Sequence, residues 1–97
     1  MVHYEFEWDE EKARANERKH GVTFDEAKTS FRDVFALELF DVDHSLDEDR
    51  FVLIGQSDRG RVLVVAYTLR DYMTIRIISA REGARQERLE YEKQINS

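Results

Sequence analysis

Four arginines follow one another closely in the second half of the chain, at Arg76, Arg81, Arg85 and Arg88. A guanidinium group presents a planar fork of N–H donors that matches phosphate oxygens and can stabilise charge on a pentacoordinate phosphorus. Arg76 lies inside an isoleucine-rich run, where its desolvation must be offset by a partner. That partner is either a ligand phosphate or a structural carboxylate, and the sequence leaves both possibilities open.

Lysine, histidine and tyrosine side chains add groups that could support phosphoryl transfer without a metal. In RNA the 2′-hydroxyl can act as the nucleophile, so the protein must position the phosphate and move protons. His20 has the basic neighbour Lys19, Arg61 can bind an anion, and Tyr67 can hydrogen-bond or stack on a base. Each also has a structural interpretation: a cation at a helix end, a cross-strand ion pair and a core aromatic residue, respectively.

Other kinds of site find no support in the sequence. The chain has no cysteine, and its three histidines show no metal-ligand spacing. The acidic segment Asp41–Asp49 lacks the ordered ligands and glycine of a calcium loop. There is no glycine-rich phosphate loop and no serine flanked as in a nucleophile elbow. We therefore expect no metal and no cofactor.

The length and charge of the chain fit one soluble domain spanning residues 1–97. No apolar run could span a membrane and the N-terminus does not resemble a secretory signal, so we expect a cytoplasmic protein. The net charge is −6, but the segment from Arg59 to Arg88 holds seven arginines and three acids. This asymmetry, +4 against −10 elsewhere, is typical of a basic site on an acidic body or of arginines paired with distant acids.

Hydrophobic periodicity predicts an α+β fold with the element order β-α-α-β-β-β-β-α. Short connections join the last four strands, so we expect an antiparallel meander, making a sheet of four to five strands covered by two N-terminal helices and one C-terminal helix. The predicted strands are residues 4–8, 34–40, 50–57, 61–69 (central) and 73–81, and the predicted helices are residues 10–20, a second helix opening at 22–26, and 82–94.

Strict alternation along the last strand separates its two arginines. Ile75, Ile77 and Arg81 share one face, whereas Arg76 belongs to the other face unless a bulge or the strand end re-aims one of them. Arg85 and Arg88 follow on the helix, where neighbouring glutamates can pair with them.

Four segments together resemble the BrnT toxin family. They are residues 6–9 (Phe-Glu-Trp-Asp), 19–27 (Lys-His-Gly-Val-Thr-Phe-Asp-Glu-Ala), 60–68 (Gly-Arg-Val-Leu-Val-Val-Ala-Tyr-Thr) and 75–81 (Ile-Arg-Ile-Ile-Ser-Ala-Arg). Shorter matches are Arg50-Phe51, Gly55, Glu87-Arg88 and Tyr91-Glu92, so the likeness covers nearly the whole chain in the family's order.

The resemblance implies a RelE-like fold and a type II toxin that cleaves RNA without a metal and arrests growth. It implies a BrnA-type antitoxin with a ribbon-helix-helix domain, which binds operator DNA, so that the toxin reaches DNA only indirectly. The matching positions imply catalytic roles for Lys19, His20, Arg61, Arg76 and Arg81. Substrate contacts are assigned to Tyr67, Arg85 and Arg88, and we expect these groups to meet at one anion pocket on the sheet.

One position departs from the family pattern. Leu69 stands where relatives often carry a glutamate, so a proton acceptor or arginine partner is missing there. This favours either a different base, such as His20, or an alternative function: a catalytically weak module that binds the antitoxin and takes part in operon regulation.

Overall fold

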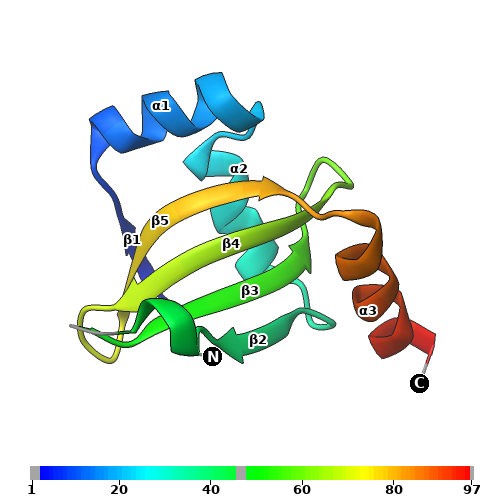
Figure 1. Ribbon diagram of the computed structural model, residues 1–97. Helices are drawn as coiled ribbons and strands as arrows, with labels where there is room; N and C mark the ends of the chain where they lie inside the picture. The colour runs from blue at the N-terminus through cyan, green and yellow to red at the C-terminus, as the bar shows by residue number, and fades with distance from the viewer. Residues whose placement is uncertain (1–2, 46–47, 97) are drawn as a thin grey trace.

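A five-stranded sheet forms the centre of the computed structural model, which describes residues 3–45 and 48–96 (Figure 1). The strand order is β1-β5-β4-β3-β2, so β4 is the central strand, as predicted. The strands are β1 Glu5–Glu7, β2 Leu37–Phe40, β3 Arg50–Gln56, β4 Val62–Leu69 and β5 Thr74–Glu82.

The predicted meander is confirmed, because β2, β3, β4 and β5 pair antiparallel in succession. The prediction of an antiparallel sheet was wrong for β1, which pairs in parallel with β5 and makes the sheet mixed. Short connections in the sequence predict hairpins only, whereas β1 finds its partner about seventy residues away, at Thr74–Arg76.

Two helices follow β1; both predicted ends of the first and the predicted start of the second are confirmed. Helix α1 spans Glu10–His20: Asp9 caps its start, accepting from the backbone N–H of Lys12, and Gly21 ends it in the left-handed region at φ 69°. Helix α2 spans Phe24–Thr29, with the hydroxyl of Thr23 accepting from the N–H of Glu26. Short 3₁₀ turns follow at η1 (Ser30–Arg32) and η2 (Val42–His44).

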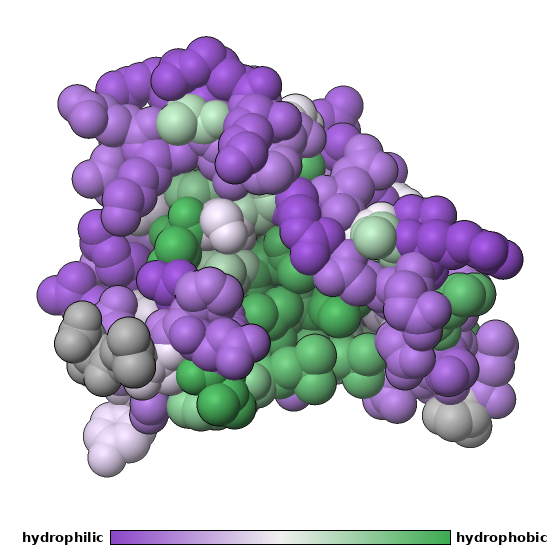
Figure 2. All heavy atoms as spheres, in the orientation of Figure 1, coloured by the Kyte–Doolittle hydropathy of each residue, from purple (hydrophilic) through white to green (hydrophobic). Residues whose placement is uncertain are grey.

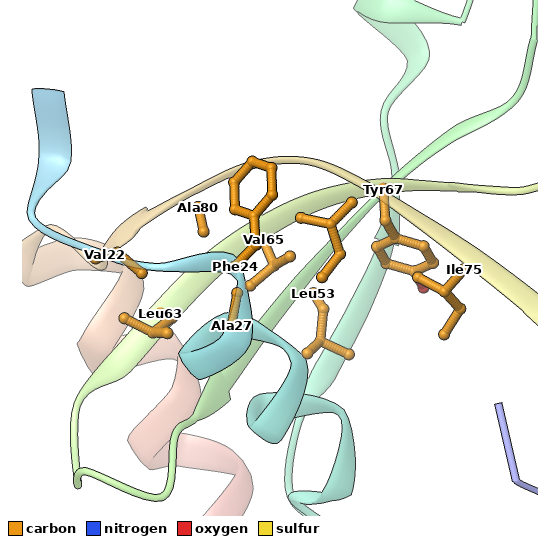
Figure 3. Packing of buried hydrophobic residues seen from close by; sticks show 10 residues of the cluster. Val22, Phe24, Ala27, Leu53, Leu63, Val65, Tyr67, Ile75 and Ala80 are labelled. Atoms are coloured by element: carbon orange, nitrogen blue, oxygen red, sulfur yellow. The ribbon is translucent and has the colours of Figure 1, made fainter. Parts of the chain in front are cut away.

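The main hydrophobic core fills the side of the sheet that α2 covers (Figure 3). Buried side chains of β3, β4 and β5 meet those of the segment that leads into α2. These residues are Val22, Phe24, Ala27, Leu53, Leu63, Val65, Tyr67, Ile75, Ile77 and Ala80. We call this side the core face and the opposite side the open face.

Helix α3, Arg85–Asn96, lies at one end of the open face (Figure 1). It begins three residues later than predicted because β5 continues to Glu82. Only Tyr91 of α3 is buried; it packs with Ile54 and Val64, and its hydroxyl donates to Asp33 Oδ2 at 2.5 Å. Within the described residues, no helix is both long and apolar enough to cross a membrane.

Candidate functional site

A β-bulge in β5 places two of the predicted arginines on the same face of the sheet. Tyr67 pairs with Ile77, but Ala66 pairs with Ser79, so Ile78 is an extra residue in β5. The bulge reverses the alternation beyond it, and Arg76 and Arg81 therefore both lie on the open face. The prediction from simple alternation, that Arg81 lies on the opposite face from Arg76, was therefore wrong.

Arg76 belongs to a polar row that crosses three neighbouring strands of the open face. It pairs with Thr68 of β4, and Thr68 pairs with Arg50 of β3. Because neighbouring strands lie nearly 5 Å apart, the two arginine backbones are separated by about 10 Å, with the threonine between them. Within the described residues, Arg50 Nε and the buried hydroxyl of Thr68 have no hydrogen-bond partner. Unpaired buried polar atoms of this kind call for an explanation, and a bound ligand or water is one.

Glu7 of β1 extends this row on the other side of Arg76. Its Oε2 accepts from Arg76 Nη1 at 2.7 Å and from Arg70 Nη1 at 3.1 Å. Glu7 and Arg76 are about one-third exposed and Arg70 about half exposed. A guanidinium has five N–H donors, so one contact with Glu7 leaves most of the donors of Arg76 available for a ligand.

Arg81, at the other end of β5, forms a bidentate ion pair with Glu87 of α3. Its Nη1 and Nη2 donate to the two carboxylate oxygens at 2.7 and 2.8 Å. This pairing lowers the pKa of Glu87 and raises that of Arg81. A ligand on Arg81 must therefore compete with Glu87, in contrast to Arg76.

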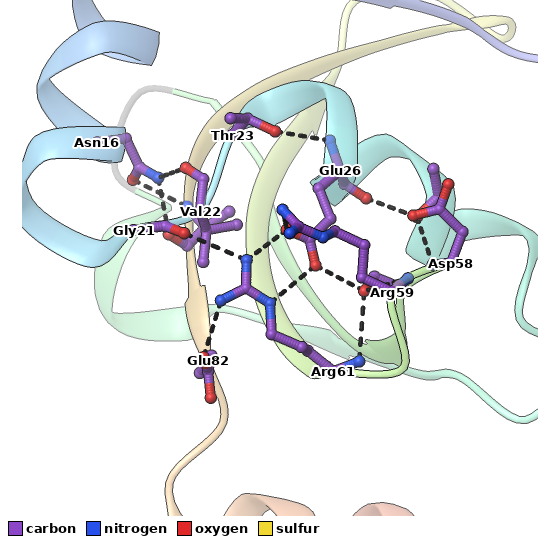
Figure 4. A network of polar contacts seen from close by, with 12 residues as sticks. Asn16, Gly21, Val22, Thr23, Glu26, Asp58, Arg59, Arg61 and Glu82 are labelled. Atoms are coloured by element: carbon purple, nitrogen blue, oxygen red, sulfur yellow. Dashed lines mark hydrogen bonds and ion pairs between the residues drawn. The ribbon is translucent and has the colours of Figure 1, made fainter.

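Arg61, the residue just before β4, is the centre of an ion-pair network that reaches Glu26 of α2 (Figure 4). Its Nε and Nη2 donate to the carboxylate of Glu26, its Nη1 donates to Glu82 at 2.8 Å, and Nη2 also donates to the carbonyl of Gly21. Glu26 is only 3% exposed, and the hydrogen bonds from Arg61 lower its pKa. Four bonds to protein groups support a structural role for Arg61 rather than contact with a substrate.

Tyr67 is also turned away from the open face. It is 2% exposed in the main core, between the rings of Phe31 and Phe51, and its hydroxyl donates to Glu38 Oε2 at 2.6 Å. Burial, together with this hydrogen bond, raises the pKa of Tyr67 well above its usual range. Stacking on a base would require the ring to leave the core.

The remaining predicted residues lie outside the polar row. Lys19 is exposed and His20 half-buried in the last turn of α1, next to the Gly21 carbonyl that Arg61 contacts. Arg85 is exposed in the first turn of α3, and Arg88 donates to the carbonyl of Gly83 at 2.7 Å. The expectation that all the predicted side chains meet in one pocket was therefore wrong.

Four residues of the row were not predicted as site residues: Glu7, Arg50, Thr68 and Arg70. Two of them are arginines, a residue type that suits a phosphate site, and this could have drawn attention to them. Their meeting depends on the strand register and on the parallel pairing of β1 with β5, which local sequence patterns do not determine. Arg50 could have been suspected because it is an arginine in a predicted strand. Its position opposite Thr68 could not have been predicted in this way.

Hydrophobic side chains occupy the rest of the open face, beside α3. Figure 2 views this face and shows them gathered over the lower strands, between polar side chains of α1 and α3. They line a groove of about 480 Å³ that ends at the Arg81–Glu87 pair. Its apolar residues are Leu37, Leu39, Phe40, Val52, Ile54 and Val64. The open face thus combines a basic end, a floor with the small residues Ala66 and Ser79, and an apolar end.

The described residues include no group of three or more His, Asp or Glu side chains suited to hold a metal ion. The polar groups of the row on the open face are guanidinium, hydroxyl and carboxylate groups.

One family model matches most of the chain. The family model described as the ribonuclease toxin BrnT of type II toxin–antitoxin systems matches residues 8–87. Among solved structures, the chain is similar to the crystal structure of the Brucella abortus ribonuclease toxin BrnT. The two share 21% identity with a TM-score of 0.62, over 88% of this chain and 100% of that one. No curated protein matches the chain.

Proposed function

Because the chain belongs to the BrnT family of ribonuclease toxins of type II toxin–antitoxin systems, we propose that its open face cleaves RNA without a metal ion. The 2′-hydroxyl of the substrate attacks the neighbouring phosphate, and the protein positions that phosphate and stabilises its charge. The observation that carries the proposal is the polar row Arg50–Thr68–Arg76, in which two guanidiniums flank a buried hydroxyl on the open face of the sheet.

Within this proposal the arginines have unequal roles. Arg76 holds the scissile phosphate, since most of its donors have no protein partner among the described residues. Arg50 and Arg70 contribute positive charge from the two neighbouring segments. Arg81 binds an adjacent phosphate when it exchanges Glu87 for the ligand. Lys19 and His20 stay predictions, because no contact links them to the row in the described structure.

The antitoxin belongs to the proposal as well. A type II toxin implies an antitoxin partner, and the sequence resemblance points to the BrnA type. The apolar groove beside α3 gives such a partner a hydrophobic surface that adjoins Arg81. An antitoxin on that surface would cover the phosphate site, block cleavage and thereby prevent growth arrest in the cytoplasm.

The test is cleavage of single-stranded RNA by the purified protein in EDTA. We expect the wild type to cleave, and Arg76→Ala to lower kcat/KM by about 10²-fold or more, as loss of one charge-stabilising donor does. The matched control is Arg14→Ala, an exposed arginine on α1, which we expect to cleave at the wild-type rate. Equal activity in all three proteins would remove the polar row from the mechanism.

The alternative function, an antitoxin-binding module without useful catalysis, is favoured by the saturation of Arg61 and Arg81 by carboxylates. It gives a different outcome in the same assay: no RNA cleavage and no growth arrest on expression without the partner, while tight antitoxin binding is retained.

A further inference from the structure

We propose that Glu7 is the general base of the RNA-cleaving site, the group that accepts the proton of the attacking 2′-hydroxyl. The inference rests on the proposed function and adds the proton acceptor that Leu69 cannot supply. It starts from topology: parallel pairing of β1 with β5 places Glu7 directly beside Arg76 on the open face.

The two oxygens of the Glu7 carboxylate have different surroundings. Oε2 accepts from both Arg76 and Arg70, whereas Oε1 has no hydrogen-bond partner among the described residues. The carboxylate is therefore anchored through one oxygen and presents the other, with 37% of the side chain exposed. A base must be held in place and still have a free lone pair within reach of the substrate, and this arrangement meets both conditions.

The arginine that anchors Glu7 is also the one proposed to hold the phosphate. A phosphate on the remaining donors of Arg76 lies next to Glu7, and in RNA the 2′-hydroxyl is on the ribose attached to that phosphate. The electrostatics suit the reaction: the guanidiniums of Arg70 and Arg76 both contact Glu7, and they stabilise the charged phosphate as the new bond forms.

The step balances without another reactant. The 2′-hydroxyl gives its proton to Glu7 and its oxygen forms a bond to phosphorus, while the bond from phosphorus to the 5′-oxygen of the next nucleotide breaks. The leaving oxygen takes a proton from water, and Glu7 returns its own proton to solvent. The products are a 2′,3′-cyclic phosphate and a 5′-hydroxyl end.

The chain contains a matched control for this carboxylate. Glu5 lies in the same strand and on the same face, two residues before Glu7, and is exposed opposite Thr74. Glu7→Gln preserves the shape of the side chain and an oxygen that can accept from the arginines, but it removes the base. Glu5→Gln makes the same chemical change at a carboxylate that contacts no arginine among the described residues.

The experiment measures cleavage of single-stranded RNA in EDTA as a function of pH, for wild type, Glu7→Gln and Glu5→Gln. We expect Glu7→Gln to lower kcat by about 10²–10⁴-fold, the range for loss of a general base, with KM and the melting temperature near wild type. Wild-type activity should fall at acid pH as the base is protonated, and this acid limb should be absent from Glu7→Gln. Glu5→Gln should retain both rate and pH profile.

The charged groups around Glu7 bear on that pH profile. Arg70 and Arg76 face it from the β4–β5 turn and from β5, and Asp9 lies within electrostatic range of Arg76. The pKa of Asp9 is lowered mainly by the backbone N–H of Lys12. Asp9→Asn serves as a second control, because it changes a carboxylate that lies near Arg76 without changing Glu7. The fall in the activity of this variant at acid pH should match that of the wild type.

Three outcomes would overturn the assignment. A Glu7→Gln variant with nearly wild-type kcat would exclude Glu7 as the base. A variant that is slower but keeps the acid limb would show that Glu7 only positions the arginines. Absence of cleavage by the wild type, with cleavage absent from every variant, would instead overturn the proposed function and the base together.

Discussion

Arginine partners decide which predicted residues face a substrate and which hold the fold together. Arg61 and Arg76 have the same chemistry, yet Arg61 pairs with a glutamate that is 3% exposed, whereas Arg76 shares with Arg70 a carboxylate that is 37% exposed. Residue type alone could not separate these two cases, because the carboxylate partners lie 35 and 69 positions away in the chain.

The Arg61–Glu26 pair gives the first stability prediction. Glu26→Gln should lower the free energy of unfolding by about 3–5 kcal/mol at neutral pH, because it leaves a guanidinium facing a partner without charge. The matched control is Glu82→Gln on the other side of Arg61. That glutamate is 57% exposed, so the loss should stay below about 1 kcal/mol. Urea unfolding would measure both, and equal losses would contradict the structural role assigned to Glu26.

The pH dependence of stability follows from the same pair. Hydrogen bonding to Arg61 holds the pKa of Glu26 below its usual 4.5. The stability that ionised Glu26 contributes is therefore complete above that value and is lost as the pH falls through the lower folded-state pKa. We expect the wild type to lose stability on acidification and Glu26→Gln to lose less. Unfolding curves that fall in parallel from pH 6 to pH 3 would argue against this linkage.

At the scale of elements, helix α1 continues the sheet edge where β1 ends. The amide of Asn16 donates to the carbonyls of Ala80 and Val22 at 2.8 and 3.0 Å and accepts from the N–H of Ala80 at 3.0 Å. One side chain thus takes the place of a neighbouring strand beside β5, and it satisfies three backbone groups that would otherwise be buried without partners.

Asn16→Ala should therefore destabilise the protein by about 3 kcal/mol, since each backbone group left unpaired costs about 1–3 kcal/mol. Hydrogen exchange at the N–H of Ala80 should become faster, because its acceptor is removed. Arg14→Ala, on the same helix but exposed, should change neither quantity. Unaltered protection of Ala80 in Asn16→Ala would show that another group closes this edge.

The elements themselves were largely predictable from local patterns. The capping residues Asp9, Thr23 and Gly21 set the ends of α1 and the start of α2, and alternation gave the strands to within a few residues. The bulge at Ile78 and the parallel pairing of β1 are set by long-range contacts. Because those two features assemble the polar row, the sequence indicated the chemistry of the site but not its composition.

At the scale of the whole molecule, a small basic region lies on a chain of net charge −6. Binding of RNA should therefore be weak at high salt and should depend on a few phosphate contacts. For two or three contacts, the logarithm of affinity should fall with the logarithm of salt concentration with a slope of about −2. Arg76→Ala should reduce that slope by about 0.7, measured by fluorescence anisotropy with a 2′-O-methyl oligonucleotide. A slope unaffected by the substitution would mean that Arg76 contacts no phosphate.

The most direct test of the account is to locate bound RNA with alanine methyl signals. Ala66 lies on the floor of the open face beside Ser79, whereas Ala15 is exposed on α1, one turn before Lys19. On titration with a 2′-O-methyl oligonucleotide, NMR spectra should show a large shift of the Ala66 methyl and none at Ala15. A shift at Ala15 with Ala66 unchanged would contradict the account and place the RNA on the Lys19–His20 end of α1.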